Sequence, residues 1–309
     1  MSSNIVFADP NDAVLKNVVG ASVFWNLADN VDRASLCAAL DKAFGNGGSY
    51  GHIPAEVTPA AALKRLMGRF TDRSNILKDA KHPMVGSRLP SYGIFRKSEI
   101  GRLNDGYELL WAAGVVFQNR DGRTNEDLAQ NGLVFSGDID HETIRESFCL
   151  ELELIGPTEQ SVWLTNLVRS AMRGLPFGNG MFFISPEHIK HWRELTRLLS
   201  GFGITLHEIP AMRSDQAVAA VLSSLTDFCK KFKSELDEEI SGYYARKAEG
   251  GTRKIQDRVI ASRQQRCDEQ LALIASYEAL FDTKLDDIRN QFLECRGAFG
   301  RLQMVGELR

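Results

Sequence analysis

Apolar residues recur at alternating intervals of four and three positions along the last third of the chain. Only Gln264 and Glu278 are polar among the members of this repeat. The members are Val218, Leu222, Leu225, Cys229, Phe232 and Leu236, and then Ile260, Gln264, Cys267, Leu271, Ile274, Glu278, Phe281, Leu285, Ile288, Phe292, Cys295, Phe299 and Leu302. Apolar side chains at the a and d positions of several heptads keep one helix face turned toward a partner helix. The pattern therefore predicts long helices that pair as in a coiled coil.

Residues that favour helix ends divide this repeat into two helices. Ser214-Asp215 is suited to cap a helix that runs to about Lys247, and Thr252 to cap a second one that runs at least to Arg296. Gly250-Gly251 lies between them, which favours an antiparallel hairpin. An equal alternative is a helical bundle that packs back on the rest of the chain.

Eight apolar residues of the expected hairpin form its predicted interaction seam. They are Leu222, Leu225, Phe232, Leu271, Ile274, Phe281, Leu285 and Ile288. The two polar members of the repeat, Gln264 and Glu278, are expected to fix register or partner number at some cost in stability.

The preceding residues predict two further regions. Residues 1–89 form a helical N-terminal region, with one helix capped by Asn30 or Asp32 and another opened by Thr58-Pro59. Residues 90–212 alternate between strand and helix patterns, and a helix from Pro186 lies between two short apolar strands.

The whole chain is therefore predicted to be α+β. The expected architecture is a helical N-terminal region, a small mixed sheet with a βαβ unit over residues 90–212, and a long C-terminal antiparallel helical hairpin over residues 213–309.

Charge is distributed unevenly in a chain of 309 residues with a net charge of −3. Residues 61–105 hold ten lysines and arginines against four acids, and residues 121–160 reverse this balance. Such asymmetry indicates either a basic binding surface or two solvated faces. A net charge near zero gives no general attraction to nucleic acid or to acidic membranes.

Cysteine use and hydropathy indicate a cytoplasmic protein without a membrane partner. The five cysteines show no CxxC spacing, and three of them lie on the heptad repeat, where a thiol acts as a small apolar residue. The longest apolar stretch, residues 109–117, is far shorter than the roughly 20 residues of a membrane-spanning helix.

Asp138 and Asp140 form the most distinct acidic pair, because they follow a predicted strand directly. Two carboxylates at such a place suit Mg²⁺, and Glu208 is the candidate for a third ligand. A turn residue followed by a helix N-cap explains the same pair equally well.

Other sites for chemistry are weakly indicated. His188 and His191 lie three positions apart on one helix face, a spacing that suits either a bridged metal or a solvated face. The chain has no phosphate-binding glycine loop and no serine or cysteine in a recognised nucleophile motif. We therefore assign no catalytic residue, cofactor or metal ligand.

The expected tip of the hairpin is basic. Its candidate nucleic-acid contacts lie beside Tyr243 and Tyr244, whose rings could stack on bases. These contacts are Arg246, Lys247, Arg253, Lys254 and Arg258. The alternative is a solvated end of a coiled coil.

Two stretches resemble uncharacterised proteins of bacteriophages and other prokaryotic mobile elements. One is Val23-Phe24-Trp25-Asn26-Leu27 with Ala38-Ala39-Leu40, and the other is Gly180-Met181-Phe182-Phe183-Ile184-Ser185-Pro186-Glu187-His188 followed by Ile209-Pro210. The resemblance implies a prokaryotic, cytoplasmic setting. Its motifs consist of core and turn residues, so it implies no activity and no site residue.

Three functions follow from these patterns. The first is a non-enzymatic assembly protein that self-associates as a homo-oligomer, or binds a protein partner, through the helical arm. The second is a nucleic-acid-binding protein that uses the basic tip. The third is a Mg²⁺-dependent phosphoryl-transfer enzyme at Asp138 and Asp140.

Overall fold

The computed structural model describes residues 18–45, 52–70, 76–78, 91–98, 106–117, 119–137, 139–178, 180–248 and 257–307. These residues form a mixed fold of helices and small antiparallel sheets, as the α+β prediction required. The chain divides into two compact units. Within the described residues, unit 1 contains 18–25, 168–197 and 205–307, and unit 2 contains 26–167 and 198–204.

Unit 1 is built on a four-stranded sheet with the strand order β10-β1-β9-β8. The strands are β1 (Val18–Asn26), β8 (Leu175–Pro176), β9 (Phe182–Ile184) and β10 (Thr205–Met212), and the π-helix η3 (Leu167–Ala171) precedes β8. Helix α6 (Pro186–Ser200) joins β9 to β10 and turns its buried Trp192 toward the sheet. The Trp192 indole lies 6.3 Å from the Trp25 ring and donates a hydrogen bond to the His207 carbonyl oxygen.

Strand β1 lies inside this sheet, so the prediction of a helical N-terminal region over residues 1–89 is wrong at residues 18–26. The strand carries Val19, Ala21 and Val23 into the core, and β-branched residues favour a pleated, buried surface. It also separates β9 from β10, so the strands of the predicted βαβ unit share a sheet but are not neighbours.

Gly20 permits a close approach between β1 and β9. A Cβ atom on this residue would lie 2.2 Å from Cζ of Phe183 and 2.4 Å from the carbonyl oxygen of Ile184. Its φ of 155° is also one that glycine tolerates best. The glycine therefore lets the Phe183 ring pack directly over the backbone of β1.

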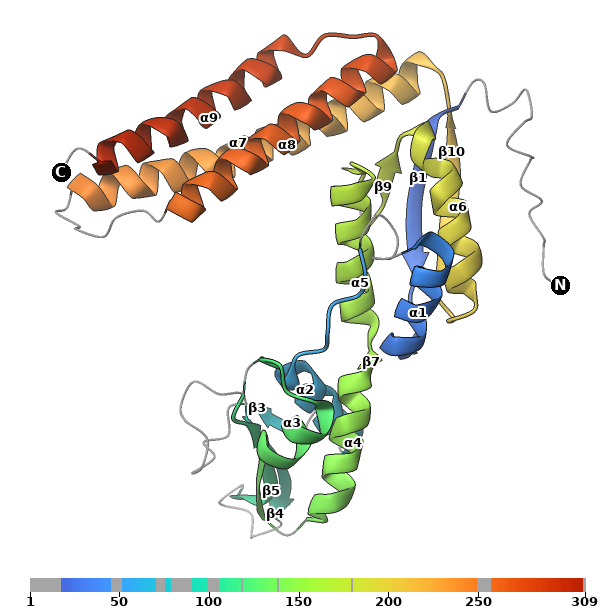
Figure 1. Cartoon of the computed structure of the whole chain (residues 1–309), viewed down its shortest axis with the longest axis vertical. Coiled ribbons are helices and arrows are strands. Elements are labelled where there is room, and N and C mark those ends of the chain that lie inside the picture. Colours follow the sequence, from blue (N-terminus) through green and yellow to red (C-terminus); the bar gives the residue numbers. More distant parts are fainter. Residues whose placement is uncertain are drawn as a thin grey trace. The chain divides into compact units, whose positions relative to one another are not determined.

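The heptad residues of unit 1 form a bundle of three helices. These helices are α7 (Asp215–Ala248), α8 (Asp257–Phe281) and α9 (Asp286–Glu307). Helix α7 leads away from the sheet, α8 returns toward it and α9 leads away again (Figure 1). With 34 residues, α7 is about 50 Å long at a rise of 1.5 Å per residue.

The prediction of one unbroken second helix is wrong, because the chain reverses at residues 282–285. Asp282 takes a left-handed φ of 50° there. The Glu278 carboxylate stabilises the reversal, since it accepts a 2.7 Å hydrogen bond from the Leu285 N–H and pairs with Arg289. The polar residue at this heptad position thus closes a turn inside the chain.

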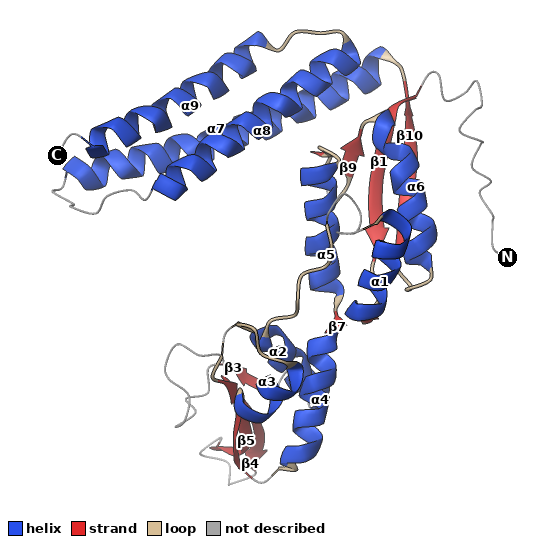
Figure 2. Ribbon diagram, in the orientation of Figure 1, coloured by secondary structure: helices blue, strands red, loops and turns tan. Residues whose placement is uncertain are grey.

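Unit 2 combines helices with two further antiparallel sheets (Figure 2). One sheet has the order β3-β4-β5-β6, and the other pairs β2 with β7. Its strands are β2 (Val31–Asp32), β3 (Ile76–Lys78), β4 (Ser91–Ser98), β5 (Gly106–Val115), β6 (Leu133–Gly137) and β7 (Leu154–Ile155). Its helices are α1 (Arg33–Phe44), α2 (Pro59–Phe70), α3 (Asn125–Asn131), α4 (His141–Glu153) and α5 (Pro157–Asn166).

Local sequence signals set several helix starts in unit 2. Asp32 caps α1 by accepting a 2.7 Å hydrogen bond from the Ser35 N–H, and Thr58 accepts one from the Ala61 N–H at the start of α2. Both predicted starts are confirmed. Helix α5 begins at Pro157, after an N-cap at Gly156.

Candidate interaction surface on the helical bundle

The predicted interaction seam lies in the core of the bundle. Leu225 and Ile274 are fully buried, and Phe232, Phe281 and Ile288 are at most 9% exposed. The remaining three, Leu222, Leu271 and Leu285, are partly buried against the same cluster. All eight seam residues therefore contact helices of their own chain.

Thiols and aromatic rings complete this core. Cys229, Cys267 and Cys295 are buried in it, as expected for thiols on the heptad repeat. Burial raises the pKa of the Cys229 thiol to about 12, so the group remains neutral near pH 7. The Phe232 and Phe292 rings lie 5.7 Å apart between α7 and α9.

Tyr277 fixes the bundle to the sheet of unit 1. Its hydroxyl donates to the carbonyl oxygens of Arg173, at 3.4 Å, and Phe183, at 3.5 Å. The centre of its ring lies 6.2 Å from that of the Phe183 ring. Burial raises the pKa of Tyr277. One end of the bundle therefore packs on the sheet through Tyr277.

Charged side chains also tie the helices together. The Arg263 guanidinium pairs with Glu239 at 2.8 Å, and Arg266 lies 4.5 Å above the Phe232 ring. Farther along, Arg296 pairs with Asp268 at 3.1 Å. Arg263 and Arg266, which lie near the predicted basic tip, thus make contacts between helices.

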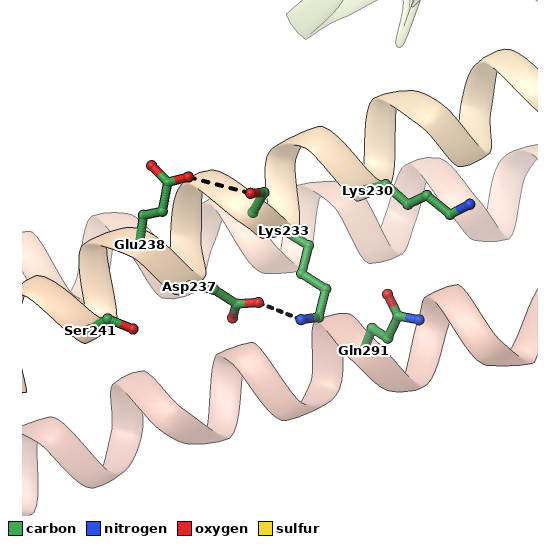
Figure 3. Close-up of a pocket in the computed structure, with 7 residues that line it drawn as sticks. Lys230, Lys233, Asp237, Glu238, Ser241 and Gln291 are labelled. Carbon is green, nitrogen blue, oxygen red and sulfur yellow. Dashed lines mark hydrogen bonds and ion pairs between the residues drawn. The ribbon is translucent and has the colours of Figure 1, made fainter.

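The outer face of α7 borders an open hollow of about 490 Å³ (Figure 3). Six lining residues come from α7 and the seventh, Gln291, from α9: Lys230, Lys233, Ser234, Asp237, Glu238, Ser241 and Gln291. Their spacing on α7 follows the helical period, so they share one face. We call this surface the α7 face.

Internal contacts hold part of the α7 face in place. Lys233 pairs with Asp237 one turn away, and the hydrogen bond from this pairing raises the pKa of Lys233. The Cys295 thiol of α9 lies 3.7 Å from the other Asp237 oxygen. Lys230 and Glu238 are exposed on either side of this pair.

Sequence reasoning missed the α7 face as a site. A signal was present in the order of charges, because Lys230, Lys231 and Lys233 precede Glu235, Asp237, Glu238 and Glu239 within ten residues. The heptad repeat concerns only apolar positions, so it does not reveal this order of charges.

The predicted nucleic-acid contacts fall largely outside the described residues. Arg253 and Lys254 lie outside them, as do the side chains of Arg246 and Lys247. Arg258 belongs to α8 and is exposed. The nucleic-acid function stays a prediction.

Two of the three candidate metal ligands, Asp140 and Glu208, have other partners, and the third, Asp138, lies outside the described residues. Asp140 caps α4 by accepting hydrogen bonds from the N–H groups of Glu142 and Thr143 and from the Thr143 hydroxyl, which lower its pKa. Glu208 makes a two-pronged ion pair with Arg193, at 2.7 and 3.0 Å. Two of the three proposed carboxylates therefore have structural roles.

His188 and His191 lie on α6 and are partly buried. Desolvation lowers the pKa of both rings. His188 lies 3.4 Å from Glu187. Across the described residues, no three His, Cys, Asp or Glu side chains gather closely enough to hold a metal ion.

Comparison with known proteins yields no relative: no family model, no curated protein and no solved structure matches this chain. The resemblance to bacteriophage and mobile-element proteins stays a prediction. Among the described residues, no helix has both the length and the apolar character needed to cross a bilayer.

Proposed function

We propose that this chain is a non-enzymatic assembly or interaction protein that binds a protein partner, or itself, through the α7 face. The observation that supports this proposal most is the open hollow of about 490 Å³ on the outer side of a bundle whose core is already filled. A partner can bind there without opening the bundle.

The proposed contact surface is the α7 face and not the heptad seam that the sequence predicts. Exposing Leu225 or Ile274 to a partner would first require separation of packed helices, because both are fully buried. Burial of a leucine or isoleucine is worth roughly 1.5–3 kcal/mol, so such an opening is costly. The α7 face needs no rearrangement of this kind.

Rigid support also favours an interaction role. Tyr277 anchors α8 on the sheet, and Glu278 with Arg289 fixes the reversal into α9. Binding to a preorganised surface avoids the entropy loss of ordering a flexible one. The bundle is therefore suited to present the α7 face to a partner.

The experiment that tests this function is site-specific photocrosslinking in cells that naturally produce the chain. A photoreactive residue at Ser234, on the α7 face, should form covalent adducts with a partner protein. The same residue at Lys190, exposed on α6, serves as the matched control and should form few. Absence of adducts from Ser234, or equal yields from both sites, would contradict the proposed function.

A further inference from the structure

We infer that the partner at the α7 face is a second copy of this chain, whose α7 lies antiparallel to the first around a two-fold axis at Ser234. This inference rests on the proposed function and names its partner. It follows from the order of charges along α7, from the small residue at its centre and from the hollow beside it.

Charge is segregated about Ser234. The cations Lys230, Lys231 and Lys233 come before it, and the acids Glu235, Asp237, Glu238 and Glu239 come after it. A surface that pairs with its own copy around a two-fold axis must be self-complementary, because each residue i that contacts j is matched by a contact of j with i. The segment 230–239, with cations before Ser234 and acids after it, meets this requirement when its copy runs in the opposite direction.

The spacing of these charges fits the two-fold arrangement. Lys230 lies four residues before Ser234 and Glu238 four residues after it, which is about 6 Å in each direction at 1.5 Å per residue. An antiparallel copy therefore brings Lys230 of each chain level with Glu238 of the other, so the pair forms twice. A parallel copy would bring Lys230 level with Lys230, and like charges repel.

The side chains around the axis leave room for this approach. Ser234 and Ser241 are small, and they line the hollow of about 490 Å³ together with the lysines. Lysine stems can pack along a facing helix while their ammonium groups remain solvated. Lys233 and Asp237 are paired within the chain, and the Ser234 hydroxyl donates a 3.5 Å hydrogen bond to one Glu238 oxygen. The exposed Lys230 and the second Glu238 oxygen are left to face the second copy.

Charge reversal at these two positions tests the inference through four samples of full-length protein. Lys230→Glu alone and Glu238→Lys alone each place like charges opposite one another at two symmetric sites. Each should weaken the dimer about ten-fold or more, as measured by sedimentation equilibrium. The double variant K230E/E238K should restore the dimer, and an equimolar mixture of the two single variants should form a heterodimer.

Lys190→Glu changes the net charge by the same amount on α6 and should leave the dimer unchanged. A monomeric wild-type protein, or a dimer that neither single reversal weakens, would overturn the inference. Failure of K230E/E238K to associate while circular dichroism shows it folded would overturn it as well. If crosslinks from Ser234 join a different protein, the second copy is the wrong partner although the proposed function stands. If Ser234 gives no crosslinks, the proposed function fails too.

Discussion

Arginines in unit 2 and lysines on α7 show two opposite uses of charge. In unit 2, Arg65 reaches from α2 into the fold, where its Nε lies 2.8 Å from a Glu151 carboxylate oxygen. Its terminal nitrogen donates 2.6 Å hydrogen bonds to the carbonyl oxygens of Glu151 and Leu154. On α7, by contrast, Lys230 and Glu238 point outward and are exposed.

The two regions therefore differ in what a change of charge would affect. Glu151 is fully buried and also pairs with Arg69 at 2.7 Å, so its carboxylate belongs to the core of unit 2. Arg120 acts similarly, donating to the carbonyl oxygens of Val57 and Leu152. The inward charges therefore contribute to folding, whereas the outward charges contribute to partner binding under the proposed function.

This contrast bears on how the uneven charge along the sequence is interpreted. The excess of cations over residues 61–105 indicated a possible basic surface, yet Arg65 in that stretch is used inside unit 2. A count of charges along the chain cannot separate the two cases, because burial depends on partners far away in the sequence. Arg65 and Glu151 are 86 positions apart.

Replacement of Glu151 should have the largest effect. Glu151→Ala removes the buried carboxylate that pairs with both Arg65 and Arg69, and Arg65 keeps only its 2.9 Å pair with Glu159. Breaking a buried pair by removal of one partner costs at most about 3–5 kcal/mol. Urea denaturation would measure the loss in the free energy of unfolding. Glu126→Ala, at an exposed position of α3, is the control and should cost under about 0.5 kcal/mol. Equal effects would mean that the network contributes little.

Truncation of side chains in the core of the bundle should have the second-largest effect on stability. Leu225→Ala and Ile288→Ala remove buried side chains from the seam, and such changes typically cost about 2–5 kcal/mol. Thermal unfolding followed by circular dichroism would measure the effect. Asp287→Ala, exposed at the start of α9, should have almost none. A seam exposed to solvent would make all three variants equally mild.

Loss of the turn contact at Glu278 should have a moderate effect. Glu278→Ala removes the acceptor of the Leu285 N–H and the partner of Arg289, and leaving a buried donor unsatisfied costs about 1–3 kcal/mol. Hydrogen exchange should accelerate first at residues 282–289. Gln264→Leu is the comparison at the other polar heptad position, and we expect it to stabilise the bundle. Unchanged exchange at 282–289 in Glu278→Ala would show that the turn does not depend on this carboxylate.

Part of the fold could be predicted because its signals are local. Asp32 before α1 and Thr58-Pro59 before α2 act within one helical turn, so a short window of sequence contains them. The burial of Leu225, Phe232 and Ile274 also followed from spacing alone. These features depend on neighbours in the sequence.

The errors arose where distant residues decide the outcome. The interval from Phe281 to Leu285 keeps the heptad spacing across the reversal, so periodicity could not reveal the end of α8. Two signals were available, the polar Glu278 and the acidic first turn of α9 at Asp286 and Asp287. The position of β1 between β9 and β10 is set by pairing across more than 150 residues, for example Ala21 with Ile184, which no local pattern encodes.

Replacement of Lys230 should have the smallest effect on stability, and it tests most directly whether inward and outward charges have different roles. Lys230→Ala should change the free energy of unfolding by less than about 0.5 kcal/mol, because its side chain is exposed and surface substitutions rarely do more. The same variant should nevertheless weaken self-association, since it removes both symmetric contacts with Glu238 of the second copy. Sedimentation and urea denaturation on one preparation would separate the two quantities. A loss of stability comparable to that of Leu225→Ala would place Lys230 among the residues that hold the bundle together, and the distinction between the two regions would then fail.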